Sequence, residues 1–223
     1  MIASRPVSSL VWYVAYGSNL STTRFSCYLR GGQPPGAART YPGARDRSLP
    51  RDDKALWIPG GIYFATQSHV WGGGRALYDP DVPGTAAARA YLITVGQFSD
   101  VLAQEMYRQT AADLDLAEIA TAGRAQIGDG RYETLIYLGH DEQAPMVTFT
   151  APWAVQDVPL LSPSATYLQV LGRGLGEAHG WDHREAATYL ASLPGAGEAW
   201  TAEQIAGLLA PGSGNARSAE LRG

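Results

Sequence analysis

The stretch that decides the fold is Tyr13-Val14-Ala15-Tyr16-Gly17-Ser18-Asn19-Leu20, near the start of the chain. The short apolar run over residues 11–15 ends at Gly-Ser-Asn, and a helical pattern follows over residues 21–30. Strand, glycine turn and helix in this order gather backbone N–H groups around one concavity, because the first N–H groups of a helix have no partner within it. Such a turn can hold a carboxylate, a phosphate or a developing oxyanion. An ordinary connection between a strand and a helix is the plain alternative.

The composition describes a soluble globular protein. Of the 223 residues, 45% are hydrophobic and 17% are charged, and the net charge of −4 argues against a nucleic-acid surface or a basic membrane patch. The N-terminal residues 1–6 lack the apolar run of a signal peptide, and no segment reaches the roughly 20 apolar residues of a membrane span. We therefore expect a cytoplasmic protein without nucleic-acid or membrane partners.

Strands lead along the chain and helices close it. Beyond the opening turn, strand-like runs lie at residues 62–66, 90–95, 132–138 and 146–150, and helical patterns at residues 98–107, 111–122, 164–178, 183–192 and 201–209. The segments 33–59 and 71–86 are rich in Gly and Pro and predict mostly irregular structure. This order predicts an α+β fold, a small mixed β-barrel or one sheet with flanking helices, in a single domain over residues 1–210. Residues 211–223 have the composition of a disordered tail.

One helical pattern carries an acid on its apolar side. Phe98, Val101 and Leu102 mark the apolar face at i, i+3 and i+4, with Ser99 or Asp100 as the expected N-cap, and the next position on that face is Glu105. Carboxylates rarely face a core. Desolvation raises the pKa of a carboxyl group towards neutrality, and such a pKa suits a group that must both take and give a proton. The plain alternative is a glutamate at a helix end that turns to solvent or pairs with Arg108.

Metal, triad and nucleotide chemistry gain little support from the motifs. Of the four histidines only His179 and His183 have helical ligand spacing, and they straddle a glycine at an expected helix start. The chain has no Cys-x-x-Cys, no His-Glu-x-x-His and no Gly-x-Ser-x-Gly elbow. The glycine clusters at residues 72–74 and 172–176 lack the preceding strand and the Lys-Ser/Thr ending of a phosphate-binding loop. The motifs therefore disfavour a zinc hydrolase or deacetylase and a nucleotide-binding loop.

Tyr16-Gly17-Ser18-Asn19-Leu20 after Val14-Ala15 resembles the signature of the gamma-glutamylcyclotransferase family. The order of other features agrees over residues 11–194. A glycine-led strand at residues 60–68 matches the family's second strand, the helix that ends at Gln104-Glu105 matches the one with its catalytic glutamate, and residues 163–167 match a segment near its C-terminus.

The resemblance implies an α+β domain on a small mixed barrel that works without metal or cofactor. Members of the family cleave γ-glutamyl amides without water, because the α-amine of the substrate attacks its own γ-carbonyl, closes 5-oxoproline and expels an amine. Glu105 would be the catalytic base and acid. The substrate-binding residues would be Tyr16, the backbone N–H groups of Gly17, Ser18, Asn19 and Leu20, and the tyrosines Tyr132 and Tyr167. For Tyr132 and Tyr167, core packing is the favoured role.

The chain also departs from the family. Met106-Tyr107-Arg108 follow the glutamate where better-known members have a glycine, and insertions at residues 71–86 and 111–122 could overhang the site as lids. The lids would favour a larger or more apolar amine half in the small-molecule γ-glutamyl substrate. Two alternatives remain open: another acyl transfer or amide hydrolysis at the same site, and a non-catalytic module that binds a small molecule. The sequence also leaves a homodimer open.

Overall fold

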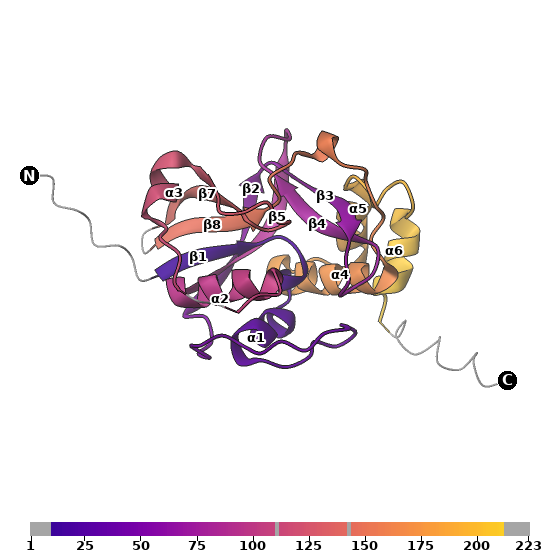
Figure 1. The fold of residues 1–223 in the computed structure, drawn as a ribbon. Helices are drawn as coiled ribbons and strands as arrows, with labels where there is room; N and C mark the ends of the chain where they lie inside the picture. The colour runs from indigo at the N-terminus through magenta and orange to yellow at the C-terminus, as the bar shows by residue number, and fades with distance from the viewer. Residues whose placement is uncertain (1–9, 110–111, 142–143, 212–223) are drawn as a thin grey trace, which may run out of the picture.

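The computed structural model describes residues 10–109, 112–141 and 144–211. Its centre is a six-stranded mixed sheet in the order β2-β5-β1-β8-β7-β6 (Figure 1). In the middle, β1 (Leu10–Ala15) pairs antiparallel with β5 (Thr85–Thr94) and parallel with β8 (Ala144–Thr150). The outer strands are β2 (Asp52–Pro59), β7 (Thr134–Asp141) and β6 (Arg124–Gln126).

A separate hairpin of β3 (Gly61–Gln67) and β4 (Gly74–Asp79) lies against this sheet. Side chains link the two sheets: the Thr150 hydroxyl of β8 accepts from the Tyr78 N–H at 3.0 Å and donates to the Tyr78 carbonyl at 2.7 Å, and the Tyr78 hydroxyl donates to the Pro59 carbonyl of β2. The α+β prediction with flanking helices is confirmed. The predicted barrel is wrong, because β2 and β6 end the strand order as edges and the sheet is not closed.

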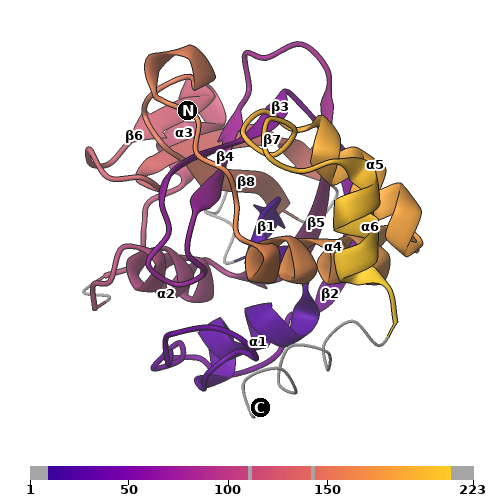
Figure 2. The same ribbon diagram turned by 90° about the vertical axis from the view of Figure 1, so that its right-hand side faces the viewer.

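Helices cover both faces of the central sheet (Figures 1 and 2). Val11, Tyr13 and Ala15 of β1 belong to the core that contains residues of α1 (Thr22–Arg30) and α2 (Val95–Glu105). The alternate residues Trp12 and Val14 face the opposite core, as the alternation of side chains along a strand requires. That second core is closed by α4 (Ala165–His179), α5 (His183–Ser192) and α6 (Ala202–Leu209). The described helices also include α3 (Ala117–Ala122) and the 3-10 turns η1 (Ser18–Leu20) and η2 (Val155–Asp157).

The start of α2 differs from its prediction. The helix begins four residues before Ser99, because Thr94 caps it: the Thr94 hydroxyl accepts from the Gln97 N–H at 3.1 Å, and the Gln97 side chain accepts from the Thr94 N–H at 3.0 Å. Ser99 and Asp100 lie inside the helix, and the Ser99 hydroxyl donates to the Val95 carbonyl. The predicted N-cap is therefore wrong.

The two expected insertions also take other forms. Residues 74–79 form the strand β4, whose six residues are all buried, so this part of the segment 71–86 lies in the interior, whereas residues 81 and 83–85 are exposed. The predicted helix 111–122 is confined to α3, and residues 110 and 111 lie outside the described part. The predicted tail, apart from Pro211, lies outside it too. No helix in the described ranges is long and apolar enough to cross a membrane.

Candidate active site

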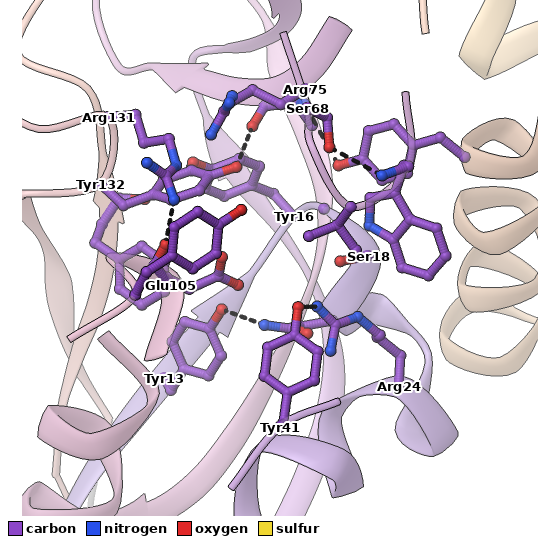
Figure 3. Close-up of a pocket in the computed structure, with 18 residues that line it drawn as sticks. Tyr13, Tyr16, Ser18, Arg24, Tyr41, Ser68, Arg75, Glu105, Arg131 and Tyr132 are labelled. Atoms are coloured by element: carbon purple, nitrogen blue, oxygen red, sulfur yellow. Dashed lines mark hydrogen bonds between the residues drawn. The ribbon is translucent and has the colours of Figure 1, made fainter. Parts of the chain in front are cut away.

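A small polar cavity of about 50 Å³ lies where the end of β1, η1, the hairpin and the end of α2 meet (Figure 3). It is formed by segments that are far apart in the sequence. Seven of the residues predicted for the site line it: Tyr16, Gly17, Ser18, Asn19, Glu105, Tyr132 and Tyr167.

The glycine turn supplies backbone donors to this cavity. Within the turn, the Leu20 N–H donates to the Gly17 carbonyl at 2.9 Å and the Ser21 N–H to the Ser18 carbonyl at 3.3 Å. The N–H groups of Gly17, Ser18 and Asn19 have no hydrogen-bond partner among the described residues. Leu20 does not line the cavity; its side chain is 2% exposed and packs in the core. The donors available to a ligand are therefore those of Gly17 to Asn19.

The N-terminus of α1 is already occupied by a carboxylate of the chain. Glu177 of α4 accepts from the Thr22 N–H at 2.8 Å, from the Thr22 hydroxyl at 2.9 Å and from the Ser21 hydroxyl at 3.1 Å. An anion at the first turn of a helix satisfies its free N–H groups and its dipole. A ligand is thus left with the turn before α1 and not with the helix itself.

Glu105 is the last residue of α2 and projects its carboxylate into the cavity (Figure 3). The side chain is half-buried, and its Oε1 atom accepts a short hydrogen bond from the hydroxyl of Tyr28 on α1. Its backbone carbonyl accepts from Arg131 Nη2 at 2.6 Å. Arg108, the predicted alternative partner, instead forms an ion pair with Glu133.

The three predicted tyrosines form part of the cavity wall and are held by backbone groups. The Tyr16 hydroxyl donates to the Phe149 carbonyl at 2.9 Å and the Tyr132 hydroxyl to the Ala76 carbonyl at 3.1 Å, while the Tyr167 hydroxyl accepts from the Ala76 N–H at 3.4 Å. Burial raises the pKa of Tyr16 and of Tyr132 well above the usual value, and that of Tyr167 to about 12. These phenols therefore stay neutral, and their contacts give them a packing role as well as a place at the cavity.

Three arginines at the cavity were missed from the sequence. Arg24, Arg75 and Arg131 all line it, and none of them forms an ion pair within the described part of the chain. Among the described lining residues, Glu105 supplies one carboxylate against these three guanidinium groups. The cavity therefore has an excess of positive charge, which favours an anionic ligand group. Arg24 had a signal in the sequence: it lies four residues before Tyr28, on the apolar face of its helix.

Trp71 and Tyr107 are also among the aromatic residues of the cavity wall. Trp71 is 9% exposed, stacks on Tyr167 with ring centroids 6.0 Å apart and planes at 7°, and so brings the segment 71–86 to the cavity. Tyr107, with a φ of 59°, contacts the guanidinium groups of Arg39 and Arg131, which are 4.0 and 4.5 Å from its ring centroid. Tyr107 thus lines the cavity two residues after Glu105.

The described residues contain no group of three or more His, Cys, Asp or Glu side chains placed to hold a metal ion. His179 and His183, which have ligand spacing in the sequence, take structural positions. His179 Nε2 lies 3.1 Å from the Ala88 carbonyl, and His183 is the first residue of α5 after the N-cap Asp182.

Comparison with known proteins supports the fold. No family model matches the chain. Among curated proteins, Histone deacetylase 5 of Arabidopsis thaliana is 29% identical in an alignment of length 201, which covers 81% of this chain and 30% of that protein. The chain therefore spans less than a third of that relative, and the activity in its name belongs to the whole protein.

Among solved structures, the crystal structure of an uncharacterised human protein aligns over 91% of this chain and 99% of that chain, with a TM-score of 0.50 and 15% identity. This similarity shows a shared fold. A gamma-glutamyl cyclotransferase aligns over 90% of this chain and 98% of that chain with 16% identity, and its TM-score of 0.46 is too low to support a conclusion.

Proposed function

We propose that the protein cleaves a γ-glutamyl amide by intramolecular attack of the α-amine and releases 5-oxoproline and an amine. The observation that carries the proposal is the placement of the Glu105 carboxylate and the Gly17-Ser18-Asn19 turn at one cavity. The Tyr16 to Leu20 motif, which resembles the family signature, supports the same reaction.

In this mechanism the cavity holds the γ-glutamyl group folded on itself. The guanidinium groups of Arg75 and Arg131 suit its α-carboxylate, and the N–H groups of Gly17 to Asn19 would stabilise the oxyanion that forms on the γ-carbonyl oxygen. Correct positioning contributes much of the rate of an intramolecular attack, for which effective molarities of about 10⁵–10⁸ M are known.

Glu105 acts as base and then as acid. Its carboxylate takes a proton from the substrate ammonium, and the free amine attacks the γ-carbonyl carbon. The tetrahedral intermediate then collapses, the bond to the amide nitrogen breaks, and the leaving nitrogen receives the proton. One of the three ammonium hydrogens stays on the lactam nitrogen. Glu105 takes the second proton from that nitrogen after the ring closes and passes it to the released amine, which departs as an ammonium ion.

The test is incubation with a panel of γ-glutamyl amines and detection of 5-oxoproline. We expect Glu105→Gln to lower kcat by about 10²- to 10⁴-fold, because the amide cannot act as a base. Glu133→Gln is the matched control: it removes a carboxylate that binds Arg108 outside the cavity, so turnover should persist even if stability falls. Release of free glutamate would indicate hydrolysis, and full activity of Glu105→Gln would exclude the mechanism.

A further inference from the structure

Two side chains of helix α1, Arg24 and Tyr28, form a hydrogen-bonded chain that ends at Glu105. The mechanism above assigns no role to this chain. The Tyr28 hydroxyl donates to Glu105 Oε1, and Arg24 Nη2 donates to the Tyr28 oxygen at 2.8 Å. The same Nη2 donates to the Tyr41 oxygen at 2.6 Å, the bond drawn between Arg24 and Tyr41 in Figure 3. Glu105 is thus linked through one hydroxyl to a buried guanidinium.

The burial of Arg24 calls for an explanation. Its residue is 4% exposed, its Nε and Nη1 atoms have no hydrogen-bond partner among the described residues, and it makes no ion pair there. The guanidinium lies 4.4 and 4.3 Å from the ring centroids of Tyr28 and Tyr41, which offer cation–π contact. Burial lowers the pKa of Arg24, but Tyr28, Tyr41 and Glu105 together raise it by more, so the charge remains.

A charged guanidinium fixes the direction of the Tyr28 proton. Arginine only donates hydrogen bonds, so the Tyr28 oxygen must be the acceptor from Arg24, and its own O–H is free to point at Glu105. Burial, and the nearby Glu105, raise the pKa of Tyr28 well above its usual value, so the phenol keeps this proton. Hydrogen bonds are therefore donated in one direction only, from Arg24 to Tyr28 and from Tyr28 to Glu105.

We propose that Arg24 and Tyr28 are positioning residues that hold Glu105 Oε1 and leave Oε2 for the substrate amine. This inference rests on the proposed function. The need for such a hold is geometric, because Glu105 is the last residue of α2 and Oε2 has no partner among the described residues. Without Tyr28 the carboxylate can rotate away from the attacking amine.

The kinetic test compares Tyr28→Phe, Arg24→Gln and the double variant. We expect each single substitution to lower kcat by about 10- to 100-fold with little change in KM, since a small misplacement of a catalytic group has costs of that order. The double variant should be no slower than the slower single variant, because Arg24 acts through Tyr28. Arg24→Lys, which keeps a charged donor, should recover part of the activity.

Tyr189→Phe on α5 is the matched control, because it also removes a largely buried hydroxyl, one that accepts from the Ala87 N–H at 3.1 Å away from the cavity. Its kcat should equal that of the wild type. Effects of Arg24 and Tyr28 that multiply in the double variant would overturn the proposal. A rise in KM without loss of kcat in Arg24→Gln would do so too, since Arg24 would then bind the ligand directly.

A second readout needs no turnover. The ¹³C carboxyl signal of Glu105, assigned by its loss in Glu105→Gln, should move in Tyr28→Phe and Arg24→Gln but not in Tyr189→Phe. An unmoved signal in Tyr28→Phe would exclude the hold on Oε1, whatever reaction the protein catalyses. The absence of 5-oxoproline from every wild-type reaction would instead count against the proposed function, so the two failures are distinct.

Discussion

Glu105 and Glu133 carry carboxylates near the same end of α2, and their surroundings give them different tasks. Glu133 is 4% exposed, and its two oxygens are taken by Arg108 and by the Gly130 N–H at 2.8 Å. Glu105 has one oxygen on a hydroxyl and faces the cavity. Only the second arrangement leaves a carboxylate able to exchange a proton with a ligand.

Protonation of His179, at the end of α4, should affect the stability of the protein. Burial lowers its pKa below the usual 6.5; the contact with the Ala88 carbonyl opposes this shift, and Arg89 adds to it. The unfolded chain therefore takes up a proton on His179 at a higher pH than the folded chain does. It follows that the free energy of unfolding is unaffected above that range and falls as the pH drops through 6.5 towards the folded pKa.

We expect His179→Gln to weaken this dependence. The measurement is urea denaturation at several values between about pH 5 and pH 8, with the free energy of unfolding plotted against pH. The variant should lose less stability than the wild type on the acid side. Parallel curves for the two proteins would show that His179 contributes nothing to the dependence.

Among the elements, α4 determines where the glycine turn lies. A Cβ atom built on Gly174 would be 2.6 Å from the Leu20 Cβ and 2.8 Å from the Ser21 nitrogen, so the absence of a side chain allows this close approach. Gly174 is thus a contact point inside the helix.

Gly174→Ala should displace the turn from α4. We expect a loss of about 1–3 kcal/mol in the free energy of unfolding, as for overpacked cores, and a higher KM because the donors of Gly17 to Asn19 move. Gly207→Ala on α6 is the control: no atom lies within 4 Å of its added Cβ, so the better helix propensity should stabilise the protein by up to about 1 kcal/mol. Equal melting temperatures for both variants would contradict this reading.

The elements that the sequence predicted best have local end signals. The helices α4, α5 and α6 begin after Ser164, Asp182 and Thr201, whose side chains cap them, and their predicted bounds agree with the structure within a residue or two. The strand β4 was missed because Gly and Pro on both sides of it read as a loop. Its stability comes from pairing with β3 and from burial, which no local pattern reveals.

At the scale of the whole molecule, the sequence predicted an α+β chain but not how its sheets meet. The β3–β4 hairpin bonds to β8 through the Thr150 side chain, where a closed barrel would have a backbone ladder. The composition of the cavity could not be predicted for the same reason. Arg24, Arg75 and Arg131 come from three distant segments, and only tertiary packing brings them together. Glu105 and the turn could be predicted because each carries its own local signal.

Thr150→Val tests the junction between the sheets. The valine has nearly the same shape but leaves the Tyr78 N–H and carbonyl without their partner, and an unsatisfied buried polar group costs about 1–3 kcal/mol. Denaturation in urea should show the loss, while Thr150→Ser, which keeps the hydroxyl, should retain more stability. If valine and serine destabilised the protein equally, the hydroxyl would not be the link.

The stack of Trp71 on Tyr167 has a practical consequence. Because the indole lies in the cavity wall, with the Arg24 guanidinium 5.5 Å from its ring centroid, a ligand that enters must change the polarity around an intrinsic fluorophore. Occupancy can thus be followed optically in variants that no longer turn over. Affinity and chemistry then become separately measurable, which is what distinguishes a binding module from an enzyme.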